Sequence, residues 1–166
     1  ATGVMKSYSE LGMAEAGIKL IGPGDITTDA ELHNMGDVPL GVYTMHHYSV
    51  VHDSPENKAF VEAYRKEYGT EVPPDFLSVQ GWDGMAALYH VVEKLNGKIT
   101  ADGFINALKG WKYNSPRGPM EIDPETRDIV NNIYLRKVEK RGNALVNVEL
   151  DTIPMVKDPW KALGKK

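Results

Sequence analysis

One segment of the chain, from Gly41 to Gly97, restricts the possible folds more than any other. Val42 to Tyr48 is rich in β-branched and aromatic residues, which predicts a strand. Ser54-Pro55-Glu56 follows and is a strong helix start, because it combines a hydroxyl N-cap, a proline at the first helical position and an acid in the first turn. We expect this helix to end at Gly69.

A second, longer helix is predicted after Val72-Pro73-Pro74, which must be extended because each proline restricts the residue before it. From Asp75 onward, apolar residues recur every three or four positions and end at Asn96-Gly97, which predicts one apolar helix face. The residues of this face are Val79, Trp82, Met85, Leu88, Tyr89, Val92 and Leu95. Thr100 is expected to cap a shorter helix after it.

The amino-terminal flank adds another strand, loop and helix, the unit of a parallel α/β sheet. Residues 1–16 carry a helical apolar stripe that ends at Gly17, and Ile18 to Ile21 is predicted as a short buried strand. Gly22-Pro23-Gly24-Asp25 interrupts it, and Thr28 to Glu31 can start a brief helix through a capping box.

The carboxy-terminal flank is predicted to be β-rich. Val130 to Val138 and Ala144 to Leu150 are joined by Lys140-Arg141-Gly142-Asn143, which predicts an antiparallel hairpin. A tail over 154–166 contains Trp160, which could anchor a last short helix.

Composition excludes several classes of function. The net charge is −4 and the Lys and Arg residues are scattered, so no basic surface for nucleic acid is expected. The chain has no cysteine, which excludes disulfides, thiolate metal sites and a cysteine nucleophile. No apolar run approaches the roughly 18 residues needed to span a bilayer. Gly-x-Ser-x-Gly, P-loop and His-Glu-x-x-His signatures are missing, so enzymatic activity is disfavoured.

The order and spacing of these segments resemble the second half of a type I periplasmic (extracellular) solute-binding protein, the ligand receptor of an ABC importer of the branched-chain amino-acid class. Members of this family are much longer, so we expect the chain to be a carboxy-terminal portion. The matching segments are Ile21 to Asp25, Gly41 to Ser49, Phe60 to Gly69, Val72 to Asp75 and Gln80 to Met85.

The resemblance implies a two-lobe α/β fold with Rossmann-like lobes and a ligand cleft between them. Residues 1–40 and 128–153 would be parts of one lobe, 45–120 part of the other, and 154–166 a tail, with the amino-terminal half of the protein absent. The lobes would close about a hinge near Val42 to Tyr48 and Arg117 to Arg127.

The same resemblance implies the partners: a small amino acid or organic acid as solute, ABC permease subunits, and the amino-terminal half of the same protein, in the periplasm and with no cofactor. An alternative is a ligand-sensing regulatory domain of the same fold. Residues 160–166 resemble a true chain end, which argues against that alternative.

The loop Gly22-Pro23-Gly24-Asp25 is the first candidate ligand site, because open α/β sheets bind ligands at the carboxyl ends of their strands. In amino-acid-binding relatives a carboxylate in this loop pairs with the ligand ammonium. Gly24 aligns best with that acid, and Asp25 follows one residue later. Either Asp25 serves instead, or the ligand lacks an ammonium group, which we slightly favour. The alternative is an ordinary turn with Asp25 as its cap.

Further candidates follow from the resemblance. Thr2 lies in the first turn of a helix, whose free N–H groups suit a carboxylate, although this end of the chain could also fray. His47 or Tyr48 could line the cleft, while packing is the alternative for each. Leu77 is the best match to an apolar ligand contact, and Trp82 is a second candidate, although either could be core.

A metal site at His46 and His47 is disfavoured, because adjacent residues on a strand point to opposite faces and cannot easily share one ion. His52 is the third histidine of this segment. One packed and one exposed imidazole is the expected arrangement.

Overall fold

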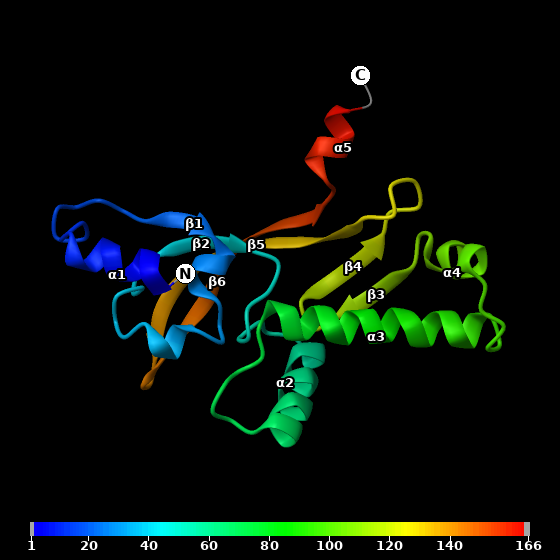
Figure 1. The fold of residues 1–166 in the computed structure, drawn as a ribbon, viewed down its shortest axis with the longest axis horizontal. Helices are drawn as coiled ribbons and strands as arrows, with labels where there is room; N and C mark the ends of the chain where they lie inside the picture. Colours follow the sequence, from blue (N-terminus) through cyan, green and yellow to red (C-terminus); the bar gives the residue numbers. More distant parts are fainter. Residues whose placement is uncertain (1, 165–166) are drawn as a thin grey trace.

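A single mixed sheet connects all parts of the computed structural model, which describes residues 2–164 (Figure 1). Its strand order is β1-β2-β5-β4-β3, and β6 pairs with β5. The strands are β1 (Ile21–Pro23), β2 (Tyr43–His46), β3 (Lys112–Ser115), β4 (Gly118–Ile122), β5 (Ile129–Arg141) and β6 (Ala144–Val156). Only the β1–β2 pair among these is parallel.

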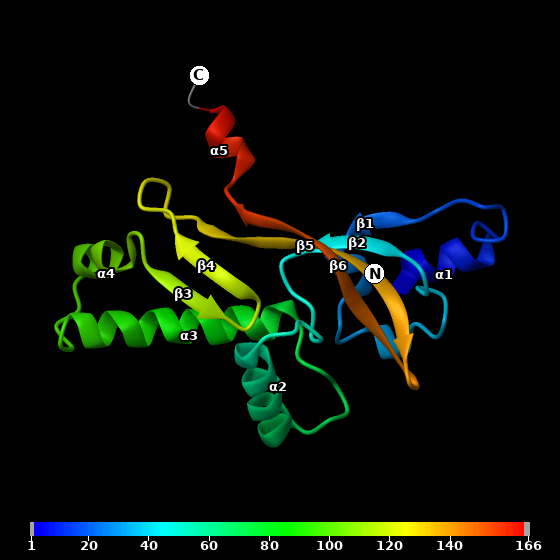
Figure 2. The same cartoon turned by 180° about the vertical axis from the view of Figure 1, so that it is seen from behind.

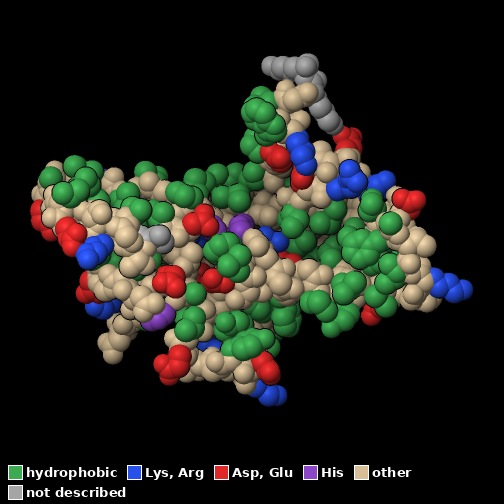
Figure 3. Space-filling model, in the orientation of Figure 1, with side chains coloured by type: hydrophobic (Ala, Val, Ile, Leu, Met, Phe, Trp, Pro, Cys, Tyr) green, Lys and Arg blue, Asp and Glu red, His purple; other side chains and the backbone are tan. Residues whose placement is uncertain are grey.

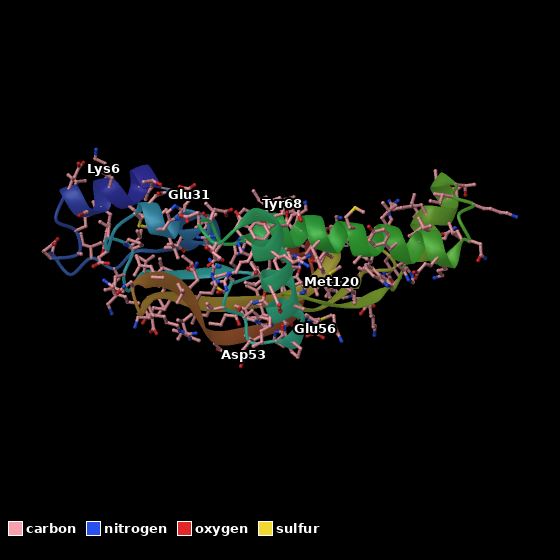
Figure 4. All side chains as sticks on the ribbon, turned by 90° about the horizontal axis from the view of Figure 1, so that it is seen from below. Lys6, Glu31, Asp53, Glu56, Tyr68 and Met120 are labelled. Atoms are coloured by element: carbon pink, nitrogen blue, oxygen red, sulfur yellow. The ribbon has the colours of Figure 1, made fainter. Side chains whose placement is uncertain are left out.

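Helices flank both ends of the sheet (Figures 1 and 2). Helix α1 (Thr2–Glu10) lies beside β1 and β2, whereas α3 (Phe76–Lys94) and α4 (Ala101–Leu108) accompany β3 and β4. Seen from below, α1, α3 and α4 cover the same face of the sheet (Figure 4). Helix α2 (Pro55–Tyr68) crosses near the start of α3, and α5 (Pro159–Leu163) follows β6.

Three of the predicted helix starts are confirmed by their caps. The Ser54 hydroxyl accepts a hydrogen bond from the backbone N–H of Asn57, and Pro55 opens α2. Asp75 and Ser78 form a capping box at the start of α3, and Thr100 caps α4. Each side-chain cap satisfies an N–H group that has no partner inside the helix, which is worth about 1 kcal/mol.

Each end of the structure has its own buried apolar cluster. One contains Met5, Leu32, Met35, Val42 and Val138, and it packs α1 against the sheet. The other contains Tyr48, Phe60, Val61 and Val79, and it joins α2 to α3. Burying each large apolar side chain contributes about 1.5 to 3 kcal/mol.

The amino-terminal predictions need correction. Helix α1 ends at Glu10 rather than at residue 16, because Gly12 is already left-handed, with φ +62°; Gly17, with φ +77°, is left-handed as expected but lies beyond the helix. The strand is Ile21–Pro23 rather than Ile18 to Ile21, and both isoleucines are exposed instead of buried.

The predicted capping-box helix from Thr28 to Glu31 is also wrong. Two 3-10 turns, η1 (Gly24–Thr27) and η2 (Leu32–Asn34), occupy this region. The cause is Asp29, which is buried and accepts hydrogen bonds from the Asn147 side chain and the Val50 backbone N–H. These tertiary bonds fix the segment in an irregular path.

The carboxy-terminal hairpin is confirmed, and both strands are longer than predicted. Strand β6 continues to Val156, through residues assigned to the tail, and residues 165 and 166 lie outside the described part. The β3–β4 hairpin was not predicted. Its signal is the alternation of Trp111 and Tyr113 before the turn Ser115-Pro116-Arg117-Gly118.

The predicted apolar face of α3 is helical but largely exposed. Val79 is buried, whereas Trp82, Met85, Leu88, Tyr89 and Val92 are each more than a third exposed. Apolar side chains gather on the end of the molecule that carries α3 and α4, on the right in Figure 3. Within residues 2–164, no helix combines the length and apolar character needed to cross a membrane.

Candidate functional site

Three segments that are distant in the sequence meet where β1 and β2 end. Gly24 follows β1, His46 ends β2, and Phe76 opens α3. A Cβ atom added at Gly24 would lie 2.2 Å from Cδ2 of His46, so the imidazole packs directly against the glycine. The His46 ring centroid lies 4.8 Å from that of Phe76, edge to face. We call Gly24, His46, His47 and Phe76 the histidine cluster.

The two histidines face the same side, contrary to the sequence prediction. Their ring centroids are 4.3 Å apart and their planes differ by 25°, which is a stacked arrangement. Strand β2 ends at His46, so the alternation of side chains between two faces no longer applies to His47. His47 also lies edge-on to Phe76, at 6.1 Å between centroids, and its Nε2 is 3.4 Å from Nε2 of Gln80.

Both imidazoles of the histidine cluster are neutral at pH 7. Burial, together with the nearby Arg136 and Arg117 guanidinium groups, lowers the pKa of His46 to about 4. Burial, His46 and the same two arginines lower the pKa of His47 to about 3, although the Asp25 carboxylate acts in the opposite direction. Each neutral ring therefore has one N–H donor and one nitrogen acceptor.

Arg136 on β5 lies beneath the cluster with only 1% of its surface exposed. Its guanidinium donates to the Thr44 hydroxyl at 3.1 Å, to the Gly24 carbonyl at 3.3 Å, and to the Tyr48 carbonyl. Among residues 2–164, no carboxylate forms a salt bridge with it, although the Asp29 carboxylate is close enough to interact. The site therefore has a buried positive charge fixed to the backbone of the β1 loop.

A buried ion pair joins the β3–β4 turn to α3. Nε of Arg117, in the β3–β4 turn, lies 2.8 Å from Oδ2 of Asp83 on α3, and both side chains are buried. The hydroxyl of Tyr134 donates to the Arg117 carbonyl at 2.7 Å. Burial raises the pKa of Asp83 while Arg117 lowers it. Removing either partner would leave the other as a buried, unpaired charge.

The structure brings together Gly24, Asp25 and His47 from the predicted set. Gly24 is buried under His46, and Asp25 beside it is exposed and interacts electrostatically with His47. Leu77 is 61% exposed, whereas Phe76, one residue earlier, packs edge to face against His46.

The side chains of three other candidates make their contacts with residues outside the histidine cluster. Tyr48 is fully buried, and its hydroxyl donates to Oδ1 of Asn57. Trp82 packs against Phe60 and donates to the Tyr113 hydroxyl at 3.2 Å. Thr2 is exposed at the start of α1, beside Met35, and Ala1 lies outside the described residues.

Sequence reasoning missed His46, Phe76 and Arg136 as parts of the site. Phe76 could have been found from its position directly after the Asp75 cap, where a helix begins. Arg136 lies between Tyr134 and Val138 in the alternating pattern of a strand, which places it on the buried side. His52, the remaining histidine of the segment, instead contacts Oε2 of Glu149 through Nδ1 at 2.8 Å.

The chain matches the family model described as periplasmic binding protein over residues 1–143. It belongs to the periplasmic binding protein family. It is 44% identical over 158 residues to the Leu/Ile/Val-binding protein homolog 6 of Brucella abortus (strain 2308), which covers 95% of this chain and 40% of that protein. The resemblance predicted from the sequence is thereby confirmed.

Solved structures of family members have the same fold. The ABC transporter solute-binding protein of Rhodopseudomonas palustris BisB5, in complex with 3,4-dihydroxybenzoic acid, is 51% identical with a TM-score of 0.90, over 95% of this chain and 43% of that one. The corresponding protein of R. palustris HaA2, in complex with p-hydroxybenzoic acid, is 42% identical with a TM-score of 0.90, over 99% and 44%. The fold is that of type I periplasmic binding proteins, and the chain spans less than half the length of these relatives.

Proposed function

We propose that this chain is part of the substrate-binding component of an ABC importer, which captures a small aromatic carboxylate in an interlobe cleft. The component would act in the periplasm and deliver the solute to permease subunits. Its task is capture and release, so we infer that it has no enzymatic activity, in line with a family of solute-binding proteins. The division of the chain between two lobes about a hinge is part of this proposal.

The packing of His46 against Gly24 is the main observation that favours a ligand acid without an ammonium group. Amino-acid binders would need a carboxylate near this position. A side chain at Gly24 would collide with the His46 ring, since its first carbon would lie 2.2 Å from that ring. The position of Gly24 is therefore packed against an imidazole ring and holds no carboxylate that could pair with a ligand ammonium.

Electrostatics favour the same choice. Arg136 and Arg117 both lower the pKa of the two histidines, so the potential at the histidine cluster is positive. A ligand ammonium would be repelled there, whereas a carboxylate would be attracted. Asp25 opposes this effect, but it is solvent-exposed, and water screens its charge more than that of a buried group.

The aromatic part of the ligand is supported by Phe76 and by the relatives. The Phe76 and histidine rings offer edges and faces to a planar solute, and such ring contacts add about 0.5 to 1.5 kcal/mol each. The two R. palustris relatives are in complex with hydroxybenzoic acids. We transfer this ligand class to the present chain as part of the proposal.

Native mass spectrometry of the full-length protein, purified without added ligand and then mixed with benzoate, 4-hydroxybenzoate or leucine, tests this assignment. We expect one bound aromatic acid per protein and no complex with leucine. Retention of leucine, with no aromatic acid bound, would refute it.

A further inference from the structure

We propose that His47 is a specificity-determining residue that hydrogen-bonds a ring hydroxyl of the aromatic ligand and so separates hydroxylated from unsubstituted aromatic acids. This inference rests on the proposed function and assigns one contact within it. His47 is held in place by its neighbours rather than by a strong hydrogen bond. It stacks on His46, meets the edge of Phe76, and its Nε2 lies 3.4 Å from Nε2 of Gln80.

The protonation state of His47 decides which ligand group it can bind. Burial is the main reason that the pKa of His47 is lowered; His46, Arg117 and Arg136 also disfavour a positive charge on the ring, whereas Asp25 favours it. His47 therefore cannot serve as the counter-ion of a ligand carboxylate near neutral pH. A neutral imidazole has one donor and one acceptor, and a hydroxyl group can pair with either of them.

The packing around His47 supports a role in ligand recognition. Gly24 and Phe76 fix His46 from two sides, and His46 in turn fixes the plane of His47. A ring that is already ordered loses little rotamer freedom when the ligand binds, so its hydrogen bond contributes more of its strength to selectivity. His47 is only half-buried, so part of its ring remains accessible.

A site built to hydrogen-bond a hydroxyl discriminates against an analogue that lacks one, because its own polar group then loses a partner. We expect the protein to bind 4-hydroxybenzoate about tenfold more tightly than benzoate, and the variant His47→Phe to bind both with similar affinity. His47→Asn, which keeps a donor and an acceptor, should retain part of the preference.

Calorimetric titration of the full-length protein with 4-hydroxybenzoate and benzoate, at pH 7.0 and at about 0.15 M salt, measures this preference. His33→Phe is a matched control, since His33 is exposed on the η2 turn and should leave both affinities unchanged. Thermal unfolding of each variant shows whether it is folded. If His47→Phe does not fold, the imidazole ¹⁵N shifts of wild-type His47 replace it, and they should report a neutral ring that changes on addition of 4-hydroxybenzoate but not of benzoate.

The outcomes separate the two proposals. If the wild-type protein binds neither acid, the proposed function fails, and this inference fails with it. If it binds both equally, if His47→Phe weakens both equally, or if the ¹⁵N shifts respond to both alike, aromatic-acid capture stands and the role of His47 is overturned. Loss of the preference in His47→Phe, with its partial return in His47→Asn, would support the inference.

Discussion

Arg136 donates a hydrogen bond from β5 to the carbonyl oxygen of Gly24, across 112 positions of sequence. The same guanidinium holds Thr44 on β2 and the carbonyl of Tyr48, where the chain leaves the sheet. One buried side chain therefore fixes the β1 loop that carries the candidate ligand site to the strand end that carries the histidines.

The first prediction concerns this buried arginine. Arg136→Met keeps much of the volume but leaves the Gly24 and Tyr48 carbonyls without their donor. Each unsatisfied buried acceptor costs about 1 to 3 kcal/mol, so we expect a loss of several kcal/mol in the free energy of unfolding. Urea denaturation of the full-length protein measures it, with Lys140→Met as a control at an exposed position of the same strand. Equal stability of the two variants would show that Arg136 does not hold the loop.

Gly24 itself provides a second prediction. Gly24→Ala places a methyl group against the His46 ring, and such overpacking costs about 1 to 3 kcal/mol. Gly84→Ala is the matched control, because it lies within α3 with nothing near the added carbon, and alanine favours a helix by about 1 kcal/mol. Thermal unfolding should therefore move in opposite directions for the two variants. A neutral Gly24→Ala would mean that the imidazole is free to move away.

The Arg117–Asp83 pair gives a third prediction. Asp83→Leu alone should destabilise the protein by about 3 to 5 kcal/mol, because it leaves a buried guanidinium without its partner. The double variant Asp83→Leu with Arg117→Met should recover much of that loss, since both charges are then gone. A double-mutant cycle by chemical denaturation reports the coupling. Additive effects would contradict the description of the two residues as a coupled buried pair.

Stability should also depend on pH through the histidine cluster. The pKa of His46 is lowered to about 4 and that of His47 to about 3, from 6.5 for an ordinary histidine. The unfolded chain therefore binds more protons than the folded one between about pH 4 and 6.5, so stability rises with pH across that window. Asp29, whose pKa burial raises to about 6, acts in the opposite direction between about pH 4 and 6.

The double variant His46→Phe with His47→Phe separates these contributions. It should lose less stability than the wild-type protein when the pH falls from 6.5 to 4, in denaturation curves recorded at each pH. An identical pH dependence of the two proteins would rule out the histidines as its source.

The sequence predicted local features well, because their causes lie within a few residues. Ser54 and Asp75 start helices through side chains that reach only three residues ahead. The buried partners of Asp29 could not be foreseen in this way, since one of them, Asn147, lies on β6. Long-range hydrogen bonds of this kind determine the conformation of irregular segments.

The candidate site was predicted only in part, for geometric reasons. Leu77 and Phe76 differ by one residue, yet neighbours on a helix point about 100° apart, so a shift of one position changes which side chain faces the site. His46 and His47 were expected on opposite faces of the sheet. Strand β2 ends at His46, so the alternation does not extend to His47, and the two rings stack.

The exposed apolar face of α3 leads to a prediction about the isolated chain. Residues 1–166 alone expose Trp82, Met85 and Tyr89, and the sheet also has unpaired edges, so we expect this piece to self-associate. Light scattering and binding of an apolar dye should both report it, whereas the full-length protein should show neither. A monomeric piece with no dye binding would contradict this expectation.

Calorimetry of the full-length protein and its Asp25→Asn variant, with 4-hydroxybenzoate and with leucine, tests the central claim most directly. If the ligand is an aromatic acid without an ammonium group, the wild-type protein binds 4-hydroxybenzoate, and Asp25→Asn leaves its affinity unchanged or improves it by removing a like charge. Leucine binding that Asp25→Asn weakens at least tenfold, about 1.4 kcal/mol, would show instead that Asp25 pairs with a ligand ammonium, and would contradict the account.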